Sequence, residues 1–162
     1  METMRQVFMP AEGEAQIREA VVREARSWLG TPFRDHARVK GAGVDCVTLL
    51  QEVYPAAGVD VGWLRRGGFY PAQWHLHLKK ELYLDHLRLV ADEMPGPPER
   101  VPKPGDVALY RYADASKVFN HAGIVIEWPM IIHTTARLVQ WGNADIDAEL
   151  KDAPRKFFSF WQ

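Results

Sequence analysis

One cysteine stands where the surrounding residue types favour covalent chemistry. Cys46 follows the glycine-rich segment Gly41-Ala42-Gly43 and Asp45, and an apolar run begins directly after it. Aspartate is a preferred N-cap, so Asp45 predicts a helix whose first turn carries Cys46. A helix start favours a thiolate, and its N–H groups can hold an oxyanion. The pattern indicates a nucleophile with a lowered pKa, and the alternative is a small buried residue heading a core helix.

Two histidines lie in segments with strand-like composition. His121 and His133 are twelve residues apart, with Glu127-Trp128-Pro129 between them. An odd turn would place residues of equal parity on one face of a hairpin, with Cβ atoms about 5 to 8 Å apart, whereas an even turn would separate them. A nucleophilic thiol needs an imidazole base and a second group that orients this base. We expect His121 to be the base and His133 the orienting residue.

The other histidines carry weaker signals. On a helix His75 and His77 would point about 200° apart, and no cysteine or carboxylate cluster completes a tetrahedral metal set, so we expect neither a metal nor another cofactor. His86, beside Asp85, is interpreted as part of a solvated helix face.

The first half of the chain has helical periodicity. Apolar residues from Ile17 to Leu29 recur at helical spacing, with Arg18 and other charged residues on the opposite side, and Gly30 ends this helix. Residues 33–43 are predicted to form a loop, residues 71–90 one or two further helices, and the proline-rich residues 91–104 a surface crossover without helix or central strand.

From residue 105 onward the pattern favours strands. β-Branched and apolar residues with period two predict strands near residues 107–110, 122–126, 130–132 and 138–141, with a closing strand at 157–161. Helices followed by an antiparallel sheet indicate an α+β fold. We expect one domain over residues 1–162, with residues 1–13 as a poorly ordered lead segment.

Composition restricts the function classes. Twenty basic and twenty-one acidic residues give a net charge of -1, which disfavours nucleic-acid binding. No apolar run approaches the ~20 residues that span a bilayer, so membrane insertion is not expected. The N-terminal residues show no secretory signal and a single cysteine forms no intrachain disulfide, so we expect synthesis in the cytoplasm.

Five short motifs occur together in a familiar order. They are Gly30-Thr31-Pro32-Phe33, Asp45-Cys46, Pro104-Gly105-Asp106-Val107, Asn120-His121-Ala122-Gly123-Ile124 and Ile132-His133. Over Ile17 to Trp141 the chain resembles the NlpC-type cell-wall cysteine peptidases, a papain-like family. The resemblance implies Cys46 as nucleophile, His121 as base and His133 as orienting residue, acting on amide bonds of peptidoglycan stem peptides. The chain looks most similar to the subgroup associated with tails of phages or gene transfer agents, which implies tail proteins as partners and action at the cell wall.

Two positions depart from this family. Val47 and Thr48 stand where a serine and a glycine are usual, and Phe33 replaces a common tyrosine. Phe33 lacks the hydroxyl, so we consider His36 as a substitute donor to an oxyanion, and Phe33, His36 and Asp45 are our candidates for substrate or oxyanion contacts. The alternative is that Phe33 is a core ring under the loop and His36 is solvated.

Three functions fit the pattern. The first is a thiol hydrolase of cell-wall peptides, the second is a non-catalytic tail or hub protein that keeps the fold, and the third is a thiol acyltransferase. The presence of Cys46, His121 and His133 favours the hydrolase, whereas Phe33 favours the non-catalytic protein.

Overall fold

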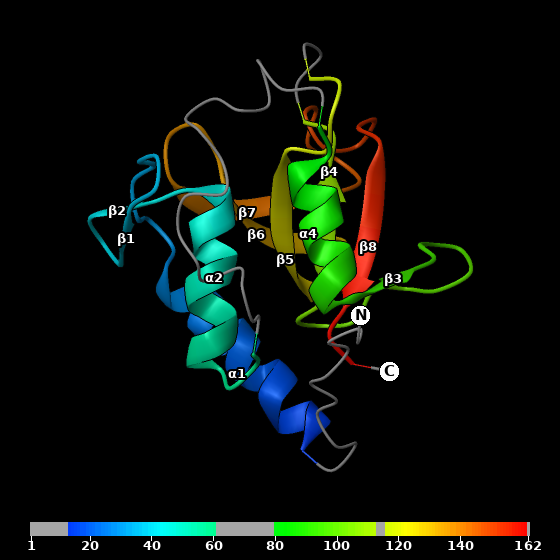
Figure 1. The fold of residues 1–162 in the computed structure, drawn as a ribbon, viewed down its shortest axis with the longest axis horizontal. Helices are drawn as coiled ribbons and strands as arrows, with labels where there is room; N and C mark the ends of the chain where they lie inside the picture. The colour runs from blue at the N-terminus through cyan, green and yellow to red at the C-terminus, as the bar shows by residue number, and fades with distance from the viewer. Residues whose placement is uncertain (1–12, 61–79, 113–115, 162) are drawn as a thin grey trace, which may run out of the picture.

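The computed structural model describes residues 13–60, 80–112 and 116–161. The helices are α1 (Glu14–Ser27), α2 (Cys46–Ala56) and α4 (Leu82–Val90). The strands are β1 (Arg38–Val39), β2 (Gly43–Val44), β3 (Asp92–Met94), β4 (Val107–Tyr110), β5 (His121–Glu127), β6 (Met130–Thr134), β7 (Val139–Asn143) and β8 (Arg155–Ser159). Figure 1 shows the β1–β2 hairpin projecting beside α2, away from the main sheet.

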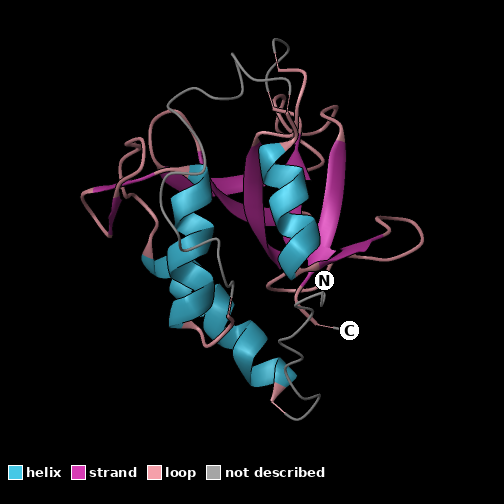
Figure 2. Cartoon of the chain, viewed as in Figure 1, coloured by secondary structure: helices cyan, strands magenta, loops and turns pink. Residues whose placement is uncertain are grey.

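The main sheet has six antiparallel strands in the order β3-β8-β4-β5-β6-β7. In the view of Figure 2, α4 crosses in front of these strands, α2 lies to its left and α1 runs below. The predicted α+β architecture, with N-terminal helices packed on a C-terminal antiparallel sheet, is confirmed. The strand predicted near the C-terminus lies inside the sheet, between β3 and β4.

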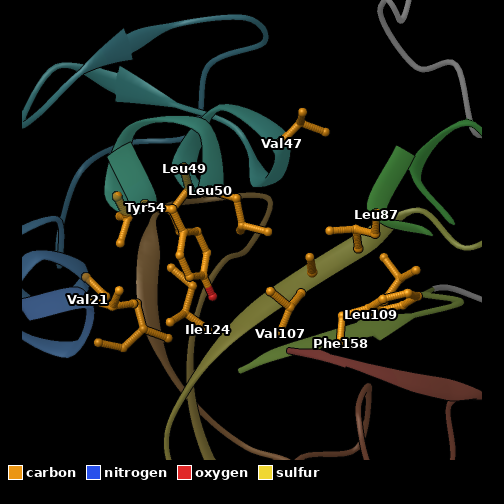
Figure 3. Close-up of a cluster of buried hydrophobic side chains, with 14 of the residues drawn as sticks. Val21, Val47, Leu49, Leu50, Tyr54, Leu87, Val107, Leu109, Ile124 and Phe158 are labelled. Atoms are coloured by element: carbon orange, nitrogen blue, oxygen red, sulfur yellow. The ribbon is translucent and has the colours of Figure 1, made fainter. Parts of the chain in front are cut away.

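The helices and one face of the sheet share a buried core. Side chains from α1, α2 and α4 meet those of β4, β5 and β8 (Figure 3), and Val21, Leu49 and Leu87 are fully buried there. Burial of a Val or Leu side chain contributes about 1.5 to 3 kcal/mol, so this cluster fixes α2 on the sheet. As a result, the head of the cysteine helix is held against the start of β5.

The opposite face of the sheet carries a smaller cluster that includes Val125, Ile131 and Leu150. His121 and His133 have the same parity as Val125 and Ile131 on their strands, so the two histidines face this second cluster. The thiol therefore approaches from the helix side of β5, and the imidazoles lie on the other face.

A β-bulge decides on which face His133 lies. Glu127 pairs with Met130, so the turn contains two residues, and an even turn alone would separate the two histidines. The register shifts between Val125 and Glu127, where one extra residue enters β5. The bulge restores equal parity, and Gly123 lies opposite His133, which places His121 one step diagonal to it. The predicted shared face is correct, although the bulge produces it instead of an odd turn.

A buried ion pair joins α1 to the loop before β4. The Arg18 guanidinium donates to Asp106 Oδ1 at 2.9 Å and to the Pro104 carbonyl at 2.7 Å, and it lies 4.0 Å from the centroid of the Trp161 ring. Arg100 approaches the other Asp106 oxygen at 2.9 Å. The interpretation of Arg18 as part of the charged, solvent-facing side of its helix is therefore wrong, because its side chain holds three distant segments together.

Three local predictions need adjustment. Residues 33–43 contain β1 and the start of β2, and residues 91–104 begin with the short edge strand β3, which ends before the prolines. His86 is half-buried, and burial lowers its pKa, so it is not part of a fully solvated face. The predicted helical region is confirmed as α4 at its C-terminal end, whereas its part that includes His75 and His77 lies outside the described residues.

Candidate active site

Asp45 caps the helix that carries Cys46. Its Oδ1 accepts from the backbone N–H groups of Val47 and Thr48 at 2.9 and 2.8 Å, and the Thr48 hydroxyl accepts from the Asp45 N–H at 2.8 Å. This reciprocal arrangement is a capping box. Thr48, a departure from the family pattern, therefore has a structural role at the head of the helix.

Asp45 also binds the loop that precedes the helix. The backbone N–H of His36 donates to Asp45 Oδ2 at 2.8 Å, and the Asp45 side chain is almost fully buried. Both carboxylate oxygens thus bind backbone groups, so the assignment of Asp45 as a substrate or oxyanion contact is wrong. Because Asp45 occupies the Val47 and Thr48 N–H groups, the Cys46 N–H is the first-turn donor left for an oxyanion.

The Cys46 sulfur lies at the start of β5. Its thiol donates to the backbone carbonyl of Asn120, the residue before His121, over 3.5 Å. On the other side of the helix backbone, the Tyr83 hydroxyl of α4 donates to the Cys46 carbonyl at 2.8 Å. Two elements far apart in the sequence thus set the position of the thiol.

The two histidines form a direct pair. His121 Nε2 and His133 Nδ1 are 2.8 Å apart, and both side chains are buried. The Tyr112 ring stacks on His121 with centroids 4.4 Å apart. Asn120 holds Tyr112 in place, because its side-chain amide bonds to both the N–H and the carbonyl of Tyr112 at 2.7 and 2.9 Å. Asn120, whose backbone carbonyl accepts from the thiol, thus also supports the ring that stacks on His121.

Electrostatics keep the thiol neutral. Burial and the charge of Asp45 raise the pKa of the Cys46 thiol well above its usual value. The lowered pKa predicted from the helix start is wrong, since the cap that stabilises the helix also brings a carboxylate close to the sulfur.

Burial lowers the pKa of His133 to about 4, and the negative charge of Asp147 opposes this decrease.

Phe33 and His36 lie at the surface beside this site. Phe33 is 38% exposed, which excludes a core ring, and its N–H donates to the Arg137 carbonyl at 2.9 Å. His36 is exposed and has a positive φ of 59°. Next to them the loop borders a groove of about 420 Å³ lined by small residues and Arg34. The structure joins His36 to the site through the hydrogen bond from its backbone N–H to Asp45.

Within the described residues, no group of His, Cys, Asp and Glu side chains is arranged to hold a metal ion. In the same part of the chain, none of the helices has the length and apolar character required to cross a membrane.

Sequence reasoning did not find the supporting residues. Tyr112, Tyr83 and Gly142 contact the site through tertiary packing, and their positions in the sequence have no distinguishing pattern. Asn120 was visible as part of the His121 motif, but its two roles, as acceptor for the thiol and as support for Tyr112, require the structure.

Comparisons with known proteins bear on the fold. Neither the scan against family models nor the search of curated proteins finds a match. Among solved structures, NlpC1 from Trichomonas vaginalis aligns with a TM-score of 0.62 and 14% identity over 96% of this chain and 46% of NlpC1. The NlpC/p60 domain of the peptidoglycan hydrolase SagA aligns with a TM-score of 0.55 and 19% identity, over 86% of this chain and 96% of that domain.

A third neighbour is RipD from Mycobacterium tuberculosis, a non-catalytic NlpC/p60 domain protein adapted to peptidoglycan binding. It aligns with a TM-score of 0.52 and 16% identity over 89% of this chain and 97% of RipD. The chain has the NlpC/P60 fold. It spans about half the length of NlpC1 and nearly the whole of the SagA domain. The NlpC/P60 fold thus occurs both in a peptidoglycan hydrolase and in a non-catalytic protein.

Proposed function

We propose that this NlpC/P60 chain is a cysteine peptidase that cleaves amide bonds in peptidoglycan stem peptides. The observation that carries the proposal is the 2.8 Å His121–His133 pair, set at the start of β5 beside the Cys46 thiol. A thiol, an imidazole and a group that orients this imidazole are the parts that acyl transfer needs. The peptidoglycan hydrolase among the structural neighbours supports the substrate class.

The first half of the reaction acylates Cys46. Because His121 Nε2 is bonded to His133, proton transfer with the thiol falls to the other ring nitrogen, Nδ1. The S–H bond breaks and a C–S bond forms to the amide carbon, while the proton moves to His121 Nδ1. Since the thiol pKa is raised, the proton leaves during the attack and not before it. The developing oxyanion accepts from the Cys46 N–H.

The second half releases the products. The C–N bond breaks as His121 donates its proton to the leaving amine, which leaves a thioester on Cys46. Water then attacks the thioester carbon while His121 takes a proton from it. The C–S bond breaks, the carboxylate product leaves and the proton returns to the Cys46 sulfur. A second oxyanion donor would raise the rate, and we retain His36 for this role; His36→Ala should then lower turnover by ~10² to 10³.

Digestion of purified peptidoglycan, with mass spectrometry of the new termini, tests the activity. The parent should release peptides with new amine and carboxylate ends, and Cys46→Ala should release none. His121→Ala should cost more than His133→Ala, whereas His133→Asn should keep part of the activity because an amide oxygen accepts from the imidazole N–H. An active Cys46→Ala variant would refute the assignment of the nucleophile.

A non-catalytic peptidoglycan-binding protein is the second candidate. The raised pKa of the Cys46 thiol and the non-catalytic neighbour RipD support it. In that case the parent would sediment with insoluble peptidoglycan and release no peptides, and Cys46→Ala would sediment equally well.

We infer further that the chain acts as part of a phage or gene transfer agent tail at the cell wall. The segment Arg155-Lys156-Phe157-Phe158, which looks similar to that subgroup, supports this inference. Mass spectrometry of purified particles from a producing strain should detect the chain in the tail fraction, and its absence from intact particles would refute the inference.

A further inference from the structure

His133 has one buried ring nitrogen that the imidazole pair leaves unused. The side chain is 2% exposed, and its Nδ1 bonds to His121. Within the part of the chain that the structure describes, His133 Nε2 has no hydrogen-bond partner. A Cβ on Gly142 would lie 2.8 Å from this nitrogen and 3.0 Å from Leu150 Cδ1, so the absence of a side chain at Gly142 makes room for the ring.

The proposed function determines which nitrogen carries the proton. To accept a proton at Nδ1, neutral His121 must carry its own proton at Nε2 and donate it to His133 Nδ1. His133 Nδ1 then accepts, so the His133 proton must sit at Nε2. This buried N–H points to the side of β6 where Gly142 and Leu150 lie. A negative charge on this side would favour the required tautomer.

Asp147 supplies a charge on that side. It lies in the turn after β7, where its Oδ2 accepts from the backbone N–H of Asn143, the neighbour of Gly142, at 2.7 Å. The negative charge of Asp147 affects both rings that contact His121, namely His133 and Tyr112. Burial lowers the pKa of His133 and Asp147 opposes this decrease, while burial, Glu149 and Asp147 together raise the pKa of Tyr112, the ring stacked on His121.

Several elements contribute the charged and titratable groups around the pair. They are Cys46 with Asp45 at the head of α2, Asp35 in the loop before β1, Tyr110 on β4 opposite His121, Tyr112 after β4, and Asp147 with Glu149 after β7. Of these carboxylates, Asp147 is the one whose charge acts on His133, whereas Asp45 and Asp35 act on the thiol.

We propose that Asp147 is a positioning residue of the candidate active site, which keeps the His133 proton on Nε2 and stabilises the positive charge that the His121–His133 pair gains from the thiol. This proposal rests on the proposed function. In the step concerned, the S–H electron pair stays on sulfur, the proton forms an N–H bond at His121 Nδ1, and the imidazole pair becomes singly positive. A fixed carboxylate near a buried cation lowers the free energy of this state.

Asp147→Asn removes the charge and keeps an oxygen that can accept from the Asn143 N–H. Asp145→Asn is the matched control, because Asp145 lies in the same turn, its side chain is 57% exposed, and its charge is not among the influences on His133. Asp147→Glu restores the charge. In urea unfolding, each variant should have a midpoint close to that of the parent, which would show that the turn is intact.

Imidazole ¹⁵N NMR of the substrate-free protein at neutral pH gives a readout independent of activity. The parent and Asp145→Asn should show His133 protonated at Nε2, and Asp147→Asn should show a mixture with the Nδ1 form. With stem peptide, Asp147→Asn should lower kcat roughly tenfold, the change equivalent to one pKa unit, with KM unchanged, and Asp147→Glu should recover most of the rate.

Identical tautomer populations in Asp147→Asn and in the parent would overturn the proposal, whatever the activity. An equal loss of kcat in Asp145→Asn would overturn it as well, because the effect would then belong to the turn. A parent that cleaves no peptide, with the NMR difference still present, would refute the proposed function and support the link between Asp147 and His133.

Discussion

The Cys46 thiol is held in its neutral form by two neighbours with different roles. Partial burial against the start of β5 reduces the access of solvent to the sulfur, and Asp45, which the helix needs as its cap, places a negative charge nearby. The base therefore matters more here than in a site with a resting thiolate, because it must remove the proton during bond formation.

We predict that alkylation of Cys46 in the folded protein is slow at neutral pH. Because the thiol pKa is raised above that of an ordinary thiol, the rate with iodoacetamide should keep rising beyond pH 9.0. The urea-unfolded chain is the control, and its rate should level off near the pKa of an ordinary thiol, about 8.5. A rate in the folded protein that levels off between about pH 5 and 7 would instead demonstrate a resting thiolate.

His133 should make stability depend on pH. Its pKa falls from the usual 6.5 to about 4 on folding, so between these values the unfolded chain binds a proton that the folded protein does not. The contribution of neutral His133 to the free energy of unfolding is complete above pH 6.5. It is lost as pH falls toward 4, and the loss reaches up to about 3 kcal/mol.

Urea unfolding at pH 7 and pH 4.5 measures this effect. The comparison with His133→Asn isolates it, because all other titrating groups, including His86, are shared by the two proteins. If both lose the same free energy of unfolding between the two pH values, His133 is protonated in the folded protein.

At this scale the sequence predicted the cap of the cysteine helix and the shared face of the two histidines, but not the protonation of the site. The cap follows from the local rule that aspartate favours a helix start, and the shared face follows from the parity rule together with the bulge in β5. The raised thiol pKa and the stacking of Tyr112 depend on burial and on packing between segments distant in the sequence, which such rules do not contain.

The capping box is the element that aligns the nucleophile. Asp45 and Thr48 satisfy three N–H groups between them, and the Asp45 carboxylate also takes the N–H of His36 from the loop. The start of α2 and the loop at the edge of the site are thus fixed by one side chain.

We predict that Thr48→Val destabilises the fold by about 1 kcal/mol, since it leaves the Asp45 N–H without its acceptor. Thr48→Ser keeps the hydroxyl and should lie close to the parent in chemical denaturation. Equal midpoints for Thr48→Val and Thr48→Ser would mean that the box contributes nothing to stability.

Strong periodicity made α1, α2 and the central strands predictable. The weaker elements were missed for a physical reason: β1, β2 and β3 have two or three residues each, and they form because a partner segment is placed beside them. Sequence patterns of such length do not separate a strand from a loop.

On the scale of the whole molecule, the Arg18–Asp106 pair connects α1 with the loop into β4, and the Trp161 ring covers it. It joins residues from the beginning, the middle and the end of the chain. Asp106 is fully buried and has a second cation, Arg100, on its other oxygen.

We predict that Arg18→Met lowers the free energy of unfolding by about 3 kcal/mol, because one cation is removed from a buried carboxylate. Arg23→Met, on the exposed side of the same helix, is the matched control and should change stability by less than about 0.5 kcal/mol. Adding Asp106→Asn to Arg18→Met should recover part of the loss; if it adds a further full loss, the two residues do not act as a pair.

The extra residue in β5 also restricts how this hairpin can vary in evolution. The alignment of His121 with His133 depends on the length of the turn and on the bulge together. A one-residue change in a strand with the turn and the bulge kept would move one imidazole to the other face, whereas a two-residue change in the turn, or loss of the bulge residue with the turn kept, would preserve the pair. Related chains that keep both histidines should therefore combine each odd change in the length of this segment with an odd change in the turn or with the gain or loss of a bulge, so an alignment of their sequences would carry a record of the site without any measurement of activity.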